Sequence, residues 1–273
     1  MHTDCHMRTV ILLLLMPAAL LAQAFPRASA SGGLYSGSFT TEALVNPDEA
    51  AAFQEATRVS FEDDLGLPDS DDLQRFSVQW RPFRNHELGA SFFSASRSGF
   101  EDIDREIRFG DTTYPVRAEV TSQLDIDFWD VTYTGWLRRS DRAGLGLTFG
   151  VSGLSIDAAV AARLPGEQQV SLTENVATDV PVPVFGLDGR VALGSRFILE
   201  GRAATLPNVT LDQYSGRAFT GAARIEFRPA RWVGIGAAYN YFRLDADVSA
   251  AGCDCELALK VQGPEAYVRL LVP

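Results

Sequence analysis

The chain has 273 residues, 46% of them hydrophobic, and a formal net charge of −11 at pH 7. This negative balance argues against nucleic acid as a partner, because phosphate binding needs clustered Lys and Arg, and Lys260 is the only lysine. The length allows one or two domains.

The first thirty residues have the features of an export signal. Arg8 precedes an apolar run from Val10 to Leu21, and small residues follow at two cleavage motifs, Ala22-Gln23-Ala24 and Ala28-Ser29-Ala30. About a dozen apolar residues are too few for a membrane-spanning helix, which needs roughly twenty. We therefore predict a signal peptide over residues 1–30, with the cleavage site left open between the two motifs.

Residues 31–56 are predicted to form a periplasmic leader. Asn46-Pro47-Asp48-Glu49 is typical of a helix start, because it has a capping side chain, a proline in the first turn and acids at the positive end of the helix dipole. We expect at most a short helix there, and the alternative is a plug inside the domain that follows.

From residue 57 to residue 273 apolar and polar residues alternate with a period of two. Trp129, Val131 and Tyr133, for example, alternate with Asp130 and Thr132. This alternation is typical of β-strands with one face toward lipid and the other toward a lumen. The same pattern recurs at 75–81, 144–151, 185–193, 197–202, 219–228 and 233–241.

The connections between these segments alternate in length. Short turns are expected at 83–86, 139–142, 194–196 and 229–231, and longer links at 99–116, 163–181, 205–213 and 246–256. Short periplasmic turns and long outer loops are the rule in outer-membrane barrels. If both termini lie in the periplasm, the number of strands must be even. The segments from Leu73 onward number about nine, so we add one more strand upstream, at Thr57–Asp64. The prediction is an all-β protein, a transmembrane antiparallel β-barrel of about ten strands, with eight as the alternative.

The last segment carries its apolar residues on two different faces. Leu257, Leu259 and Val261 share one, whereas Val268 and Leu270 lie on the other. Proline within a paired strand indicates a bulge, so we predict one at Gly263-Pro264.

The polar face of the strands carries both signs of charge, and small barrels have room for side chains and little else. We predict a lumen packed with ion pairs, and the alternative is a narrow polar conduit. The lumen-facing charged residues are predicted to be Arg75, Arg81, Glu87, Asp130, Arg138, Asp188, Arg190, Glu200, Arg202, Arg224, Glu226 and Arg228.

No catalytic, cofactor-binding or metal site is predicted. His86, the only histidine beyond the signal, falls in a periplasmic turn, and Asp125 and Asp127 would point away from Asp130 in a regular strand. The acids at 62–72 and 101–111 are interpreted as solvated loops, with Mg²⁺ or Ca²⁺ bridging to lipopolysaccharide phosphates as the alternative. Cys253 and Cys255 are interpreted as structural or inert cysteines of an outer loop.

Five short motifs resemble a group of uncharacterised outer-membrane β-barrel proteins of Proteobacteria. They are Phe61–Gly66, Trp80–His86, Ile107–Asp111, Pro181–Leu187 and Tyr239–Arg243. The resemblance runs from about Val59 to the C-terminus, implies the barrel fold and the outer membrane, and carries over no catalytic residue.

Together these patterns predict a non-catalytic outer-membrane protein with a structural or envelope-interaction role. A narrow pore for small solutes or ions is the alternative, and an outer-membrane enzyme is the third choice. The expected partners are outer-membrane lipid, lipopolysaccharide and the outer-membrane assembly machinery; the oligomeric state is left open.

Overall fold

The computed structural model describes residues 24–46, 58–102, 106–109, 112–114, 119–163, 172–211, 214–250 and 253–273. These residues form thirteen β-strands. The strands are β1 (Ala28–Asn46), β2 (Arg58–Ser60), β3 (Ser70–Phe83), β4 (His86–Asp102), β5 (Ile107–Phe109), β6 (Thr112–Tyr114), β7 (Glu119–Arg139), β8 (Ala143–Arg163), β9 (Leu172–Leu193), β10 (Phe197–Leu211), β11 (Tyr214–Ala230), β12 (Val233–Ala250) and β13 (Cys253–Val272). No helix in this part of the chain has the length and hydropathy of a membrane span.

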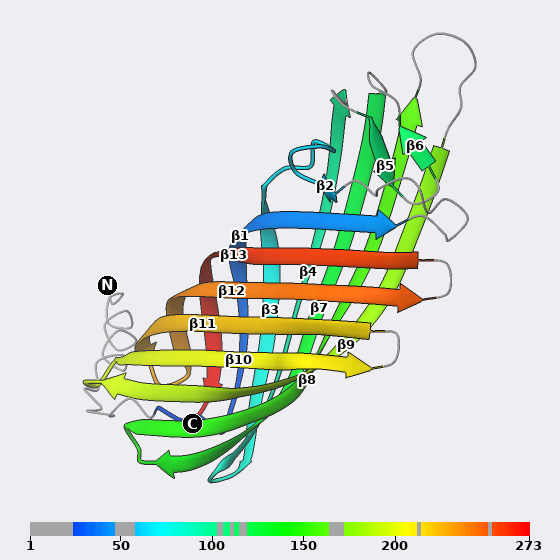
Figure 1. The fold of residues 1–273 in the computed structure, drawn as a ribbon. Helices are drawn as coiled ribbons and strands as arrows, with labels where there is room; N and C mark the ends of the chain where they lie inside the picture. Colours follow the sequence, from blue (N-terminus) through cyan, green and yellow to red (C-terminus); the bar gives the residue numbers. More distant parts are fainter. Residues whose placement is uncertain are drawn as a thin grey trace, which may run out of the picture.

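Ten of these strands close into one antiparallel barrel (Figure 1). Its order is β1-β3-β4-β7-β8-β9-β10-β11-β12-β13, and β13 pairs back onto β1. Closure pairs the backbone groups that the two edge strands of an open sheet would expose, as a wall in lipid requires. The predicted all-β barrel of ten antiparallel strands is confirmed.

The tenth strand is not the one expected from the sequence. Ala28–Asn46 pairs with β13 along its length and with β3 from Ala28 to Ser38, so it is a barrel strand and not a periplasmic leader. The segment expected at Thr57–Asp64 contributes only β2, three residues that pair with Glu42–Leu44 of β1. The prediction failed because β1 is rich in Gly, Ser and Thr and carries few large apolar side chains on its outer face. The helix start expected at Asn46-Pro47-Asp48-Glu49 falls mostly outside the described residues.

The short turns lie where the sequence indicated, whereas most of the longer links are strand. Turns of two or three residues join β3 to β4, β7 to β8, β9 to β10 and β11 to β12. Gly194, in the turn before β10, has a φ of +73°, which glycine adopts without strain. Much of the expected loops is strand, at 172–181 of β9, 205–211 of β10, 246–250 of β12 and 253–256 of β13. In Figure 1, β4, β7, β8 and β9 rise beyond the other strands. Cys253 and Cys255, expected in an outer loop, belong to the backbone of β13.

The bulge expected at Gly263-Pro264 is absent from β13. Pairing with β12 runs without a shift from Val233↔Leu270 to Ala250↔Cys253, and Pro264 lies opposite Tyr239. Leu259 and Val261 point inward, and Val268 and Leu270 point outward, on one regular strand. The apolar residues therefore change face because the surroundings of the strand change along its length.

Candidate functional site

The barrel has two sections whose polarity is opposite. On β7, Trp129 and Val131 are exposed on the outer wall, whereas Leu124, Ile126 and Phe128 are buried inside. The apolar side chains thus lie outside near the short turns and inside toward the far end. Since short turns face the periplasm, the outer-wall section is the lipid belt and the other section extends outward into water.

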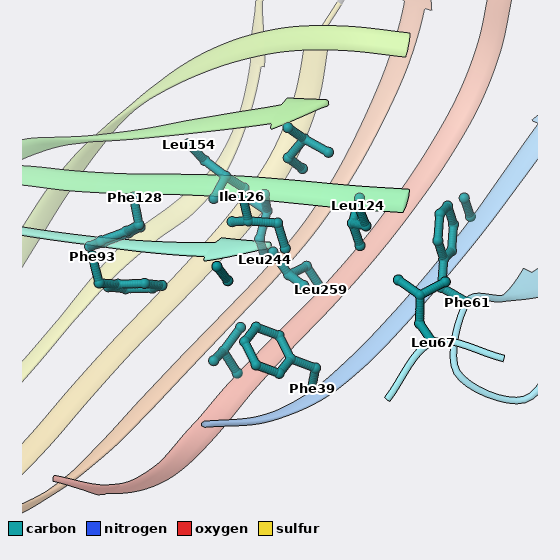
Figure 2. Packing of buried hydrophobic residues seen from close by; sticks show 14 of the residues in the cluster. Phe39, Phe61, Leu67, Phe93, Leu124, Ile126, Phe128, Leu154, Leu244 and Leu259 are labelled. Carbon is teal, nitrogen blue, oxygen red and sulfur yellow. The ribbon is translucent and has the colours of Figure 1, made fainter. Parts of the chain in front are cut away.

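The water-exposed extension has a hydrophobic core of its own. Figure 2 shows Leu124, Ile126, Leu244 and Leu259 converging inside the barrel. Each of these four is at most 2% exposed. The core spans strands from around the ring, so apolar packing and not water fills the lumen at this level.

Residues 61–69, here called the cap segment, seal this core from outside. Phe61, Leu65 and Leu67 are 3% exposed and belong to the same cluster. Figure 2 labels Phe61 and Leu67. The segment passes so close to β4 that a Cβ on Gly99 would lie 2.4 Å from the carbonyl oxygen of Gly66. The cap segment is therefore part of the core and not a loop lying over it.

A buried ion pair holds the cap segment in the barrel. Arg97 of β4 is 1% exposed, and its Nη1 lies 2.7 Å from Oε1 of Glu62. The same guanidinium donates to the Pro68 carbonyl at 3.1 Å and to Oγ1 of Thr41 at 3.0 Å, and it lies over the Phe39 ring. Glu62 also accepts the backbone N–H of Thr41. Sequence reasoning missed Arg97, although its place after Phe93 and Ala95 on an inward face was a usable signal, and it interpreted Glu62 as a solvated acid.

A second barrier crosses the lumen inside the lipid belt. Arg190 of β9 reaches Glu87 of β4, with Nη2–Oε1 at 3.1 Å, and Glu200 of β10, with Nε–Oε1 at 3.2 Å. Three strand pairings separate β4 from β9 around the wall, so the Glu87–Arg190 pair spans the interior.

The same network continues to the other side of the barrel. Arg269 of β13 contacts Glu200 at 2.9 Å and Glu226 of β11 at 3.1 Å, and Arg228 contacts Glu226 at 2.6 Å. Signs alternate along the whole chain of contacts, and every member is buried. Alternation keeps each buried charge next to an opposite one, which offsets much of the cost of removing it from water. Arg269 was not singled out from the sequence, although it alternates with Val268 and Leu270.

The remaining predicted lumen residues lie above or below this network. Arg202 contacts Asp188 at 2.9 Å, and Asp130 accepts from Ser91. Arg75 donates to the same Ser91 hydroxyl at 3.2 Å. Arg75, Asp130, Arg202 and Arg224 lie on the wall of a cavity of about 50 Å³, which has room for a few water molecules. This cavity is too small to be a wide channel between the two barriers.

Arg81 keeps the alternation of β3, whereas Arg138 departs from that of β7. Arg81 turns to the entering chain, and its Nε and Nη2 donate to the carbonyls of Pro26 and Phe25. Arg138 is exposed, contrary to prediction, because a register shift between Trp136 and Arg138 breaks the alternation. The inward guanidinium is that of Arg139, 4.6 Å from the Phe25 ring centre.

The residues considered for catalysis are not brought together. His86 is exposed at the start of β4, where its Nδ1 lies 2.5 Å from the Tyr133 hydroxyl. Asp125 pairs with Ser96 on the outer wall, whereas Asp130 hydrogen-bonds inside. Within the described ranges, no group of three or more His, Cys, Asp or Glu side chains is arranged to hold a metal ion.

No protein-family model and no curated protein matches this chain. Among solved structures, the outer membrane protease OmpT from Escherichia coli is similar with a TM-score of 0.55 at 11% identity, over 89% of this chain and 96% of that one. The transport unit of the autotransporter AIDA-I from Escherichia coli gives a TM-score of 0.40 at 9% identity, over 90% and 89%. Ail, the attachment invasion locus protein of Yersinia pestis, in complex with the heparin analogue sucrose octasulfate, gives a TM-score of 0.32 at 10% identity, over 88% of this chain and 99% of that one.

At such low identity the likeness to OmpT shows a shared fold and carries nothing about activity. The closed ten-stranded barrel with apolar residues on its outer wall is the architecture of a bacterial outer-membrane protein. The chain is an integral β-barrel protein of the Gram-negative outer membrane.

Proposed function

We propose that this protein is a closed, non-conducting barrel that has a structural or envelope-interaction role and no catalytic activity. The observation that carries the proposal is the presence of two barriers in series inside the lumen. The outer barrier is the apolar core with its cap segment, and the inner barrier is the chain of ion pairs from Glu87 to Arg228. An ion would have to leave water to cross the first and displace buried charge pairs to cross the second.

The proposed role also suits the outer surface. The extension presents Ser96, Asp125 and Asp157 to water, whereas the belt presents large apolar side chains to lipid. A rigid water-exposed extension with its own core is a suitable platform for contacts with other envelope components. We also infer membership of the proteobacterial barrel group that the sequence motifs resemble.

Conductance in a planar bilayer tests the proposal. We expect the protein purified from outer membranes to give a silent bilayer. Variants that remove one barrier, Leu124→Ala with Leu244→Ala or Glu87→Ala with Arg190→Ala, should also remain silent, because the other barrier persists. The combined variant should show unitary steps.

Each preparation is first checked by its gel migration before and after boiling, which reports whether the barrel is folded. Reproducible unitary steps from the folded wild-type protein would refute closure and make a pore for small solutes the better assignment.

A further inference from the structure

At the upper edge of the lipid belt, the charge of the outward-facing residues differs between two sides of the barrel. On β3, β4, β7 and β8 the first outward residues beyond the belt are neutral or acidic; they are Gln74, Ser94, Asp127 and Ser155. On β11, β12 and β13, which lie side by side in Figure 1, the corresponding outward residues are Arg217, Arg243 and Lys260. The only lysine of this acidic chain therefore lies in a local group of cations.

Strand register brings these three cations together. Arg243 lies opposite Lys260 on β13 and opposite Phe219 on β11, and Arg217 lies opposite Asp245 of β12. The side chains of Arg217 and Arg243 are 66% and 50% exposed. They form one continuous face, here called the cationic face, made of Arg217, Arg243 and Lys260.

One carboxylate is shared between two of these cations. Oδ2 of Asp245 lies 2.9 Å from Nε of Arg217 and 3.0 Å from Nε of Arg243. Two other acids of this wall, Glu42 and Glu256, are held by Arg58 at 3.7 and 2.6 Å. Asp247, one outward position beyond Asp245, accepts from Ser215. Asp245 lies level with Arg217, so the row nearest the lipid belt holds three cations and one acid and keeps excess positive charge. Asp247, Glu42 and Glu256 lie farther from the membrane.

Aromatic side chains lie directly below the cationic face. The ring centres of Phe219 and Tyr241 are 5.8 Å apart, and the Lys260 Nζ lies 5.9 Å from the Tyr241 ring centre. Phe219 and Tyr239 are 44% and 51% exposed toward lipid. An amphiphile bound here would place its anionic head on the cations and its acyl chains along these rings.

We propose that the cationic face binds the phosphates of lipid A, the anchor of lipopolysaccharide, in the outer leaflet. Arg and Lys make short, charge-assisted hydrogen bonds to phosphate, and each such residue near an anionic surface adds favourable binding free energy. Asp245 holds the two guanidinium groups side by side. The site specifies one partner of the envelope-interaction role proposed above and rests on that role.

The test measures lipid bound to protein purified from outer membranes, using native mass spectrometry with three added probes: bisphosphorylated lipid A, lipid A without phosphates, and phosphatidylethanolamine. The test variant is Arg217→Gln with Arg243→Gln and Lys260→Gln. The matched control, Arg142→Gln with Arg196→Gln and Arg231→Gln, removes the same charge from exposed positions at the periplasmic turns. Heat-modifiable migration verifies that every variant folds.

We expect the wild-type protein and the control to bind bisphosphorylated lipid A better than either other probe, and the test variant to bind it on the order of 100-fold more weakly. Equal losses in both variants, or equal binding of lipid A without phosphates, would overturn the site. If the lipid A site is overturned but the wild-type protein gives a silent bilayer, the proposal of a non-conducting barrel still holds. The two proposals therefore fail separately.

Discussion

Arg97 shows how one buried side chain fixes the cap segment. Its guanidinium contacts Glu62, Pro68 and Thr41, which come from both ends of the cap segment and from β1. A buried charge is tolerated only where its partners are present, so the cap segment and Arg97 require one another.

Replacement of Arg97 measures this dependence. Arg97→Ala leaves Glu62 uncompensated in the interior, so we expect a loss of about 3 kcal/mol in the free energy of unfolding. Denaturant titration of the folded band on gels gives the value. Arg58→Ala, which removes a half-exposed pair with Glu256, is the control and should cost less than about 1 kcal/mol. Similar losses in the two variants would contradict the buried anchor.

At the scale of elements, β1 completes the barrel by joining β13 to β3. Ala28 pairs with Val272 and Trp80, and Ala30 pairs with Leu270 and Val78. Without β1 the two neighbouring strands would each expose an unpaired edge in lipid, which is costly because no water is present to bond it.

Disulfide formation tests the closure. Ala30→Cys with Leu270→Cys places two thiols at directly opposed outward positions of β1 and β13, at a separation that a disulfide spans. We expect rapid cross-linking under mild oxidation, seen as altered migration after boiling without reductant. Ala30→Cys with Ile225→Cys, on non-adjacent β11, should stay uncross-linked. The reverse pattern would show that β1 lies elsewhere.

The position of β1 also chooses between the two cleavage motifs of the export signal. Cleavage after Ala30 would remove Ala28–Ala30 from the strand, together with Phe25, which packs between Trp136 and Arg139. Cleavage after Ala24 keeps both Phe25 and the first residues of β1. We predict that mass spectrometry of the mature protein finds Phe25 as the first residue; Ser31 at that position would contradict this assignment.

At the scale of the whole molecule, the barrel is a membrane protein in its lower section and resembles a water-soluble barrel in its upper one. The apolar side chains change from the outer wall to the lumen at one level around the barrel, for example between Trp129 and Phe128 on β7 and between Phe219 and Ala218 on β11. The hydrophobic effect removes apolar groups from water. In the lower section these groups lie on the outer wall against lipid, and in the upper section they lie inside the lumen.

Quenching of tryptophan fluorescence by brominated lipids tests this arrangement. The chain has four tryptophans, and Trp129 is 40% exposed on the belt whereas Trp136 is 3% exposed inside. We expect a variant that keeps only Trp129 to be strongly quenched, and one that keeps only Trp136 to be unaffected. Ser96→Trp in a chain without the other four should also escape quenching, because that position lies above the belt. Equal quenching of Trp129 and Ser96→Trp would place the upper wall in lipid.

The sequence by itself determined the fold class, the short turns and the alternation of the lipid belt. These features are local: period-two patterning and turn residues act over a few positions, so Trp129, Val131 and Tyr133 identified a lipid-facing strand without any knowledge of its neighbours. Most of the charged lumen positions followed from the same alternation, and Arg138 failed because a register shift is not visible in the pattern.

Only the tertiary structure decided which strand closes the barrel and how the lumen is sealed. β1 pairs with residues more than 200 positions away, and its weak pattern gains meaning only from β13. The apolar residues of β13 change face along the strand, which the sequence suggested was a bulge. The sequence of one strand does not reveal that its outer face is in lipid at one end and in water at the other. The contacts of Arg97 and of Arg269 are likewise long-range, and the free energy that selects them comes from burial that no local stretch of sequence contains.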